Sequence, residues 1–429
     1  MVERTVVIRG GRVVDATGER TADVLIDGGT IRAVETSIDA PAGATVIDAG
    51  GCVVAPGLVD LHTHLRQPGR EEAETVESGA RAAALGGFTA VVAMPNTEPP
   101  LDTASAVREV LELGVTAACD VRVAGAITKG RKGRELAPLG EMADLGVRLF
   151  TDDGDGVQDA RLMRRALEYA SALGVTLAQH CQDDVLAGGG HMHEGEWSSR
   201  LGIPGMPAEA EDLMVARDIS LVRLTGGRVH FLHLSTAGSV AAVRAAKAEG
   251  LAVTAEATPH HFTLTDAAVA SYDTVFKVNP PLRPPADVEA VKAGLADGTI
   301  DAIATDHAPH AAEAKDVPFD QASPGMLGLE TALALALTEL DLPVAQVLAL
   351  LSWSPARIAG LDSAHGGPVV AGRPANLCVI DPAATWLVDP DALVSRSRNT
   401  PYAGRKLTGR IRHTLLRGEP VVIDGAAQR

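Results

Sequence analysis

Histidine residues follow the ends of apolar runs in this sequence, at a spacing that suits metal binding. The first of these runs ends in Leu61-His62-Thr63-His64-Leu65-Arg66. Because side chains alternate along a strand, we expect His62, His64 and Arg66 to lie on one face. Two imidazoles two residues apart on a strand can chelate one metal ion. An isolated H-x-H pattern is a weak signal, so the pair needs support from elsewhere in the chain.

Three later apolar runs are followed by residues of the same kind. His180 follows the run Val175–Gln179, His233 follows Val229–Leu232, and Asp306 follows Ile300–Thr305. A buried, hydrogen-bonded histidine is the simpler interpretation of His180 or His233 taken alone. Matching positions at the ends of several strands indicate instead that these side chains meet at one site.

A further run ends in Phe150-Thr151-Asp152-Asp153-Gly154, which places two carboxylates at the same rim. On its own this segment suits an Asp-Gly turn as well as a ligand position. Imidazole nitrogen and carboxylate oxygen are the donors expected for zinc, and an open coordination position makes such a site catalytic. The metal would lower the pKa of a bound water towards about 7, and Asp306 would then carry the proton.

Other histidines have weaker claims to this site. The His191-Met192-His193 segment lies between Gly-rich and Glu-rich stretches, so we predict a polar loop outside the site. His260 and His261 lack a partner at ligand spacing, and we expect a structural or supporting role for them. His230 falls on the strand face opposite to His233 and is predicted to pack among helices.

The elements that position these residues follow a repeating pattern. Short apolar runs alternate with longer Ala-rich stretches of helical period, which is typical of βα units around a parallel sheet. We predict eight strands, at Leu58–His62, Ala90–Met94, Val121–Ala126, Val147–Phe150, Thr176–Gln179, Val229–Leu232, Ala252–Glu256 and Ala302–Thr305. Predicted helices include Thr75–Leu85, Ala104–Leu113, Ala160–Leu173 and Ser239–Glu249.

Eight such units predict an α/β fold of the TIM-type (β/α)8 barrel class, in which chemistry lies at the carboxyl ends of the strands. An open doubly wound sheet is the alternative, but its G-x-G-x-x-G fingerprint is missing after the first strand. Both chain ends carry short strands with Gly-rich turns, including Gly10-Gly11 and Gly28-Gly29. We therefore expect residues 1–55 and 367–429 to form a small β-sandwich domain, and residues 56–366 to form the barrel.

Composition limits the partners and the location of the protein. Of the 429 residues, 38 are Lys or Arg and 55 are Asp or Glu, a net charge of −17 that disfavours nucleic acid. The basic residues Arg131–Arg134 are expected in a solvated loop. The start, Met1–Arg4, shows no export signal, and apolar stretches are cut well before the roughly 20 residues needed to span a bilayer. We expect a soluble, cytoplasmic protein.

The cysteines give no sign of a disulfide framework or a thiolate metal site. Cys52, Cys119, Cys181 and Cys378 lie far apart and form no C-x-x-C pair. We expect them to be small buried side chains in a reducing compartment.

Five stretches of the chain, taken together, are far more specific than any one of them. They are Pro56–Arg66, Met94–Thr97, Asp152–Gly154, Asn279–Arg283 and Ala304–His310. The chain resembles the amidohydrolase superfamily and, within it, the type I dihydroorotase family. The resemblance covers nearly the whole length, including the β strands at both ends.

The resemblance implies a role for each matching residue. It implies one zinc ion held by His62, His64 and Asp306, a second held by His180 and His233, and Asp153 bridging or joining them. It also implies that Arg66, Asn96, Asn279 and His310 contact the substrate, chiefly its carboxylate, and that Asp306 is the catalytic proton carrier. An arginine fork with amide donors is also the set that hydrogen-bond geometry favours for a carboxylate.

The residue at the bridging position separates relatives within the superfamily. Hydantoinases, dihydropyrimidinases, allantoinases and other dihydroorotases usually carry a carboxylated lysine there, whereas this chain has seven lysines and none between Lys132 and Lys247. Asp153 therefore fits the type I branch. Because aspartate is shorter, the number of zinc ions per chain stays open between one and two, with two favoured.

The activity that the resemblance implies is reversible hydrolysis of dihydroorotate to N-carbamoyl-L-aspartate in de novo pyrimidine (UMP) biosynthesis. Two alternatives stay open: another cyclic amidohydrolase, such as a hydantoinase or allantoinase, and a non-catalytic partner of aspartate carbamoyltransferase. The missing lysine and the presence of Arg66 weigh against the first, and the complete ligand set weighs against the second. We expect a homodimer, and association with aspartate carbamoyltransferase stays open. The long stretch 311–328 suits a functional loop or lid and a plain surface loop equally well.

Overall fold

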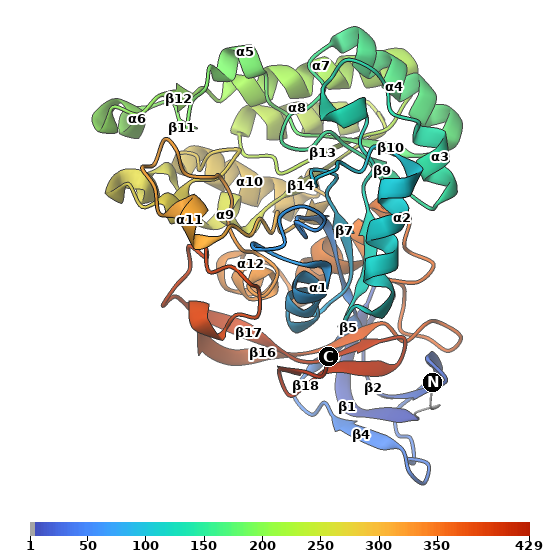
Figure 1. Cartoon of the computed structure of the whole chain (residues 1–429). Coiled ribbons are helices and arrows are strands. Elements are labelled where there is room, and N and C mark those ends of the chain that lie inside the picture. Colours follow the sequence, from blue (N-terminus) through green and yellow to red (C-terminus); the bar gives the residue numbers. More distant parts are fainter. Residues whose placement is uncertain (1–4) are drawn as a thin grey trace.

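The computed structural model describes residues 5–429, and a ring of parallel strands lies at its centre (Figure 1). Residues Met1–Arg4, where we saw no export signal, lie outside the described residues. The ring strands are β6 (Leu58–Thr63), β7 (Phe88–Ala93), β8 (Asp120–Val123), β9 (Leu149–Phe150), β10 (Thr176–Gln179), β13 (Val229–Phe231), β14 (Val253–Ala257) and β15 (Ala302–Ile303).

Parallel ladders join six of the eight neighbouring strand pairs of the ring. Single bridges complete the circle: Gly125 with Phe150 joins β8 to β9, and Thr63 with His307 joins the two ends of the ring. The predicted (β/α)8 barrel is confirmed, and all eight strands lie where apolar runs predicted them. The strands read as apolar runs because both of their faces are buried.

Helices surround the ring (Figure 1). They are α1 (Val76–Leu85), α2 (Ala104–Leu113), α3 (Leu139–Asp144), α4 (Ala160–Leu173), α5 (Asp184–Ala187), α6 (Glu196–Leu201), α7 (Glu209–Thr225), α8 (Ala237–Ala248), α9 (Pro259–Thr263), α10 (Pro285–Asp297), α11 (Ala312–Lys315), α12 (Ala332–Glu339), α13 (Val344–Leu348) and α14 (Ser354–Ile358). The four helices predicted from periodicity begin at side-chain caps, supplied by Thr75, Thr103, Asp159 and Thr236.

Both ends of the chain contribute to one nine-stranded sheet, in the order β19-β18-β17-β16-β5-β1-β2-β3 with β4 beside β1. Its strands are β1 (Val6–Asp15), β2 (Gly18–Asp27), β3 (Thr30–Glu35), β4 (Thr45–Asp48), β5 (Val53–Pro56), β16 (Leu377–Leu387), β17 (Lys406–Leu416), β18 (Glu419–Ile423) and β19 (Ala426–Ala427). The expected turn at Gly10-Gly11 is wrong, because β1 continues through it with a register shift between Ile8 and Gly11. Gly10, at φ +72°, supplies the irregular residue of this bulge.

Alternation along β5 shows how this sheet attaches to the barrel. Val53 and Ala55 belong to the large core shared with the barrel helices, whereas Val54 belongs to a separate core within the sheet. The same strand therefore seals two hydrophobic cores, one on each face. The division of the chain at residues 55/56 and 366/367 stays a prediction.

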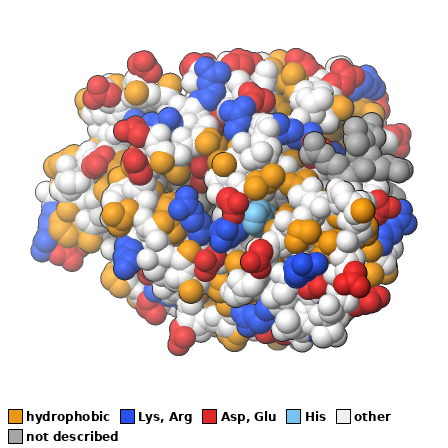
Figure 2. Space-filling view, turned by 90° about the horizontal axis from the view of Figure 1, so that it is seen from below, with side chains coloured by type: hydrophobic (Ala, Val, Ile, Leu, Met, Phe, Trp, Pro, Cys, Tyr) orange, Lys and Arg blue, Asp and Glu red, His pale blue; other side chains and the backbone are white. Residues whose placement is uncertain are grey.

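The surface and the cysteines are as the composition suggested. Figure 2 shows Lys and Arg side chains interspersed with Asp and Glu on the face seen from below. The four cysteines are buried free thiols. Within residues 5–429, none of the helices has the length and apolar character that crossing a membrane requires.

Candidate metal centre

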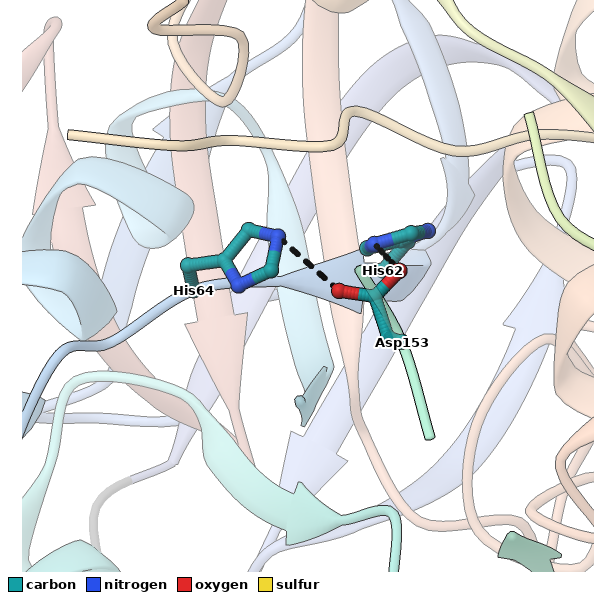
Figure 3. A group of neighbouring side chains, drawn as sticks. All are labelled: His62, His64 and Asp153. Carbon is teal, nitrogen blue, oxygen red and sulfur yellow. Dashed lines mark ion pairs between the residues drawn. The ribbon is translucent and has the colours of Figure 1, made fainter. Parts of the chain in front are cut away.

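Asp153, just after β9, lies between two groups of histidines. One group contains His62 and His64, whose Nε2 atoms lie 3.3 and 3.6 Å from the two oxygens of the Asp153 carboxylate (Figure 3). In the other group, His180 Nδ1 and His233 Nε2 lie 3.8 and 3.7 Å from Asp153 Oδ1. Both groups are buried, and within each group the possible donor atoms lie within 4.8 Å of one another. Asp153 is the carboxylate common to both.

Asp306, just after β15, completes the cluster. Its Oδ1 lies 3.1 Å from His64 Nε2 and 3.5 Å from His62 Nε2. All six side chains that were predicted as ligands therefore come together at the carboxyl ends of the barrel strands. Their function as metal ligands stays a prediction.

Three site residues adopt a left-handed backbone at these strand ends. The φ angles are +31° at His233, +45° at Asp306 and +60° at Arg66. Such conformations cost about 1–3 kcal/mol each in residues other than glycine and collect at functional sites. We expected Arg66 to share a face with His62 and His64 through strand alternation. However, β6 ends at Thr63, so the loop that follows places the Arg66 side chain.

The donor atoms fit a metal ion. His62 Nδ1 is bonded to Glu256, while His62 Nε2, which faces Asp153, has no hydrogen-bond partner among the described residues. A buried polar atom left without a partner costs about 1–3 kcal/mol, which a bound cation would remove. Imidazole and carboxylate donors are typical of zinc.

Burial and charge act against each other in this cluster. Burial alone would raise the pKa of Asp153 and favour its neutral form. The nearby His62 imidazole outweighs this effect and holds the pKa of that carboxyl well below its usual value. Likewise, burial opposes charge on His62, but Asp153 and Asp306 raise the pKa of its imidazole well above 6.5. At His180, burial and the nearby His233 lower the pKa to about 3, so its ring is neutral at pH 7 and can offer a lone pair.

Glu256, at the end of β14, contacts the cluster and was missed by the sequence interpretation. This fully buried carboxylate accepts hydrogen bonds from His62 Nδ1 at 2.9 Å and from His230 Nε2 at 2.9 Å. The prediction that His230 packs among helices is wrong, because strand alternation breaks at the left-handed His233. The available signal was an acidic residue ending the apolar run Ala252–Glu256.

Two further aspartates fix the strand ends rather than face the histidines. Asp60 accepts a hydrogen bond from Thr305 N at 2.8 Å and so ties β6 to the end of β15. Burial raises its pKa to about 6. Asp152 accepts hydrogen bonds from Ile127 N and Thr128 N at 2.9 and 3.0 Å, which ties β9 to the loop after β8. Of the pair Asp152 and Asp153, only Asp153 belongs to the cluster.

The residues predicted to contact substrate surround this cluster. Asn96 accepts from His64 Nδ1 at 2.9 Å and donates to Asp153 Oδ2 at 3.3 Å. Asn279 Nδ2 lies 3.4 Å from His180 Nε2, and Arg66 Nη2 lies 3.4 Å from His310 Nε2. Burial lowers the pKa of the Arg66 guanidinium to about 10, so it remains charged at pH 7.

Residues in two segments expected to be loops make specific contacts. Met192–His193 forms the short strand β11, paired with β12 (Gly205–Met206), and His193 Nδ1 lies 3.0 Å from Arg283 Nη1. Arg131 donates from Nη2 to the backbone oxygen of Asp153 at 2.7 Å. The guanidinium therefore supports the turn that carries Asp153, which charge counting alone did not indicate.

His260 and His261 are buried beside the cluster. His261 is held between the Thr258 hydroxyl at 2.8 Å and the Pro280 carbonyl at 3.0 Å, in line with the expected structural role. The stretch 311–328 carries α11 and buries Phe319 and Met326, so it is a packed loop rather than a loose surface excursion.

Comparison with known proteins gives one consistent family. A family model described as Dihydro-orotase-like matches residues 51–239. A dihydroorotase from Streptomyces coelicolor is 53% identical over 97% of this chain and 98% of its own length. One from Pelotomaculum thermopropionicum is 50% identical over 97% of this chain and 98% of its own.

Solved structures agree on the fold. The L-hydantoinase (dihydropyrimidinase) of Arthrobacter aurescens superimposes with a TM-score of 0.89 at 25% identity, covering 99% of this chain and 97% of its own. A D-hydantoinase (dihydropyrimidinase) from Thermus sp. gives a TM-score of 0.85 at 25% identity, covering 98% and 96%.

Proposed function

The chain belongs to the dihydroorotase family of cyclic amidohydrolases, and from this we propose that it hydrolyses dihydroorotate reversibly to N-carbamoyl-L-aspartate in pyrimidine biosynthesis. One observation carries the proposal: the two dihydroorotases named above are 53% and 50% identical over 97% of the chain, whereas the two hydantoinase structures named above are 25% identical.

We propose zinc as the metal, with two ions per chain. His62, His64 and Asp306 would hold one, His180 and His233 the other, and Asp153 would be shared. The support is that Asp153 belongs to both ligand groups. When bound, zinc supplies an activated water at neutral pH and withdraws charge from a carbonyl oxygen.

Asp306 is the proposed proton carrier. It stands within 3.1 Å of His64, on the rim where the scissile amide would lie. In the hydrolytic direction its carboxylate takes the proton of the attacking water. It then delivers that proton to the departing ring nitrogen, so the same group acts first as base and then as acid.

The substrate carboxylate is proposed to bind at Arg66 and His310, with Asn96 and Asn279 on either side. A buried guanidinium offers two parallel donors to a carboxylate, which fixes the ring relative to the metal. Orientation of this kind contributes several kcal/mol to catalysis. Arg66 is well suited to it because its Nε is already anchored to Pro309 O at 3.1 Å.

A direct test offers four cyclic amides to the purified, zinc-loaded protein: dihydroorotate, hydantoin, dihydrouracil and allantoin. We expect kcat/KM to be highest for dihydroorotate, the one substrate of the four with a carboxylate on its ring. A higher kcat/KM for any neutral ring would contradict the proposal. The hydantoinase or allantoinase alternative is not favoured, because the relatives of high identity are dihydroorotases.

We further propose that the protein acts in the cytoplasm as a homodimer. Association with aspartate carbamoyltransferase is the proposed additional contact. Light scattering of the protein alone, and then mixed with that transferase, tests both assemblies. An active protein that stays monomeric in both measurements would contradict them.

A further inference from the structure

Residues 395–399, between β16 and β17, leave the terminal sheet and reach the mouth of the barrel. Ser395 donates its hydroxyl to Glu74, and Ser397 Oγ donates to Ala73 O at 2.8 Å. These contacts fix the segment to the loop after β6, which carries Arg66. Asn399, two residues further along, contacts the loop after β15 instead.

The Asn399 side chain makes three hydrogen bonds to that second loop. Its Nδ2 donates to Ala308 O at 2.9 Å and to Gly325 O at 3.1 Å. Its Oδ1 accepts from the backbone N–H of His310 at 3.2 Å. The residue is only 7% exposed, so water does not substitute readily for these bonds.

These contacts join the two ends of a long loop that runs from Ala308 to Gly325. Ala308 N also donates to Met326 O at 2.8 Å, and His310 Nε2 lies 2.8 Å from Pro324 O. At Gly325, where φ is +141°, a Cβ atom would lie 2.8 Å from His310 Nε2. This close approach therefore requires glycine at position 325. The end of the loop packs directly against the His310 ring.

Arg66 contacts the same loop from the other side. Its Nε donates to Pro309 O at 3.1 Å, and its Nη2 lies 3.4 Å from His310 Nε2. The separation of Arg66 and His310 thus depends on where the backbone of residues 308–310 lies. Asn399 is the side chain that holds this backbone from the C-terminal segment.

We infer that Asn399 is a positioning residue that sets the pocket for the substrate carboxylate by holding His310 beside Arg66. This inference rests on the proposed function, in which those two side chains bind the carboxylate. An aspartate at this position has nearly the same shape, but it cannot donate to Ala308 O and Gly325 O. Its negative charge would instead face two carbonyl oxygens, and the loop would move away.

The test compares Asn399→Asp with Asn376→Asp. Asn376 is a matched control, because it is a buried amide that donates to Ala364 O at 3.0 Å and accepts from Arg417 N at 2.7 Å, in the terminal sheet region. We expect N399D to raise KM for dihydroorotate about tenfold with a smaller change in kcat. The control N376D should lower Tm and leave KM within about twofold.

A double-mutant cycle with His310→Ala separates positioning from general damage. If Asn399 acts through His310, N399D adds less than about twofold to KM once the imidazole is gone. If N399D raises KM by the same factor in wild type and in H310A, the inference is overturned. An unchanged KM in the N399D single variant would also overturn it.

Hydrogen exchange gives a readout that needs no substrate. We expect peptides within residues 309–325 to exchange faster in N399D than in wild type, and unchanged exchange there in N376D. If wild-type protein fails to hydrolyse dihydroorotate, the proposed function falls while the exchange experiment still tests the hold on the loop. Unchanged exchange of 309–325 in N399D would overturn the inference itself.

Discussion

At the carboxyl ends of the barrel strands, four imidazoles and two carboxylates crowd together, whereas at the amino end of β8 the acidic Asp120 is fully paired. Asp120 Oδ2 lies 2.9 Å from His365 Nε2, its Oδ1 pairs with Arg417, and His365 Nδ1 bonds to Thr89. Both carboxylate oxygens of Asp120 and both ring nitrogens of His365 therefore have partners. In the metal centre, by contrast, His62 Nε2 faces the carboxylates of Asp153 and Asp306 at 3.3 and 3.5 Å but has no hydrogen-bond partner among the described residues.

The difference shows how one fold uses buried charge in two ways. A buried charge that is paired and hydrogen-bonded supports the structure, since removing either partner leaves the other uncompensated. Buried donors that lack partners weaken the apo protein and leave capacity for a ligand. Substitutions at the carboxyl end should therefore change activity or metal affinity, and those at the Asp120 cluster should change stability alone.

The largest expected effect is that of Asp306→Asn. Losing the proton carrier should lower kcat by about 10²- to 10⁴-fold. Absorbance loss during ring opening measures this, and circular dichroism checks that the fold is kept. Turnover near that of wild type would remove Asp306 from its proposed role.

The second largest effect on activity is expected for Arg66→Ala. Losing a charged hydrogen-bonding partner should raise KM for dihydroorotate by roughly 100-fold. The same substitution should change the weaker binding of a neutral ring such as dihydrouracil far less. Equal losses for both rings would contradict carboxylate recognition by Arg66.

A smaller effect is expected for Glu256→Gln, which keeps the shape and one acceptor oxygen but replaces the other oxygen with an NH2 donor and removes the charge facing His62 Nδ1. Losing such an outer carboxylate weakens metal binding about tenfold or more. Competition with a chelating dye measures the zinc affinity directly. An affinity equal to wild type, in a protein of unchanged Tm, would mean that Glu256 does not orient His62.

The smallest effect, and one on stability alone, is expected for Asp120→Asn. Burial would raise the pKa of Asp120, but His365 and Arg417 outweigh it and lower the value from 3.8 to about 2. Because the folded pKa is depressed, the stabilisation is complete above pH 3.8 and is lost as pH falls towards 2. The shift corresponds to about 2 kcal/mol at pH 7.

Urea unfolding of wild type and D120N between pH 7 and 3 measures that difference. The gap in unfolding free energy should be constant from pH 7 to about 5 and should narrow below pH 4. Zinc affinity should be the same in both proteins. If the difference in unfolding free energy grows as the pH falls, Asp120 is not stabilised by its pairing with His365 and Arg417.

The sequence predicted the barrel well because both faces of its strands are buried, which leaves an unbroken apolar run at each strand. It also predicted the convergence of His62, His180 and Asp306, since parallel strands end on the same side of a barrel. What it could not predict was set by backbone geometry outside the strands. The left-handed His233 breaks the alternation that was used to place His230.

Supporting residues were harder to find for the same reason. Glu256 and Asp60 act through contacts with residues about 190 and 245 positions away in the chain, and no local pattern records such pairs. Arg131 was interpreted from its charge and neighbours alone, although it contacts both the backbone of Asp153 and the carboxylate of Asp155. Nor did the Gly10-Gly11 pair distinguish a turn from a bulge within one strand.

Anomalous diffraction at the zinc edge, from crystals of the zinc-loaded protein, tests most directly whether Asp153 is shared between two metal ions. We expect two peaks that share Asp153, one beside His62 and His64 and the other beside His180 and His233. A map without a peak at Asp153, or with zinc bound only elsewhere, would contradict it.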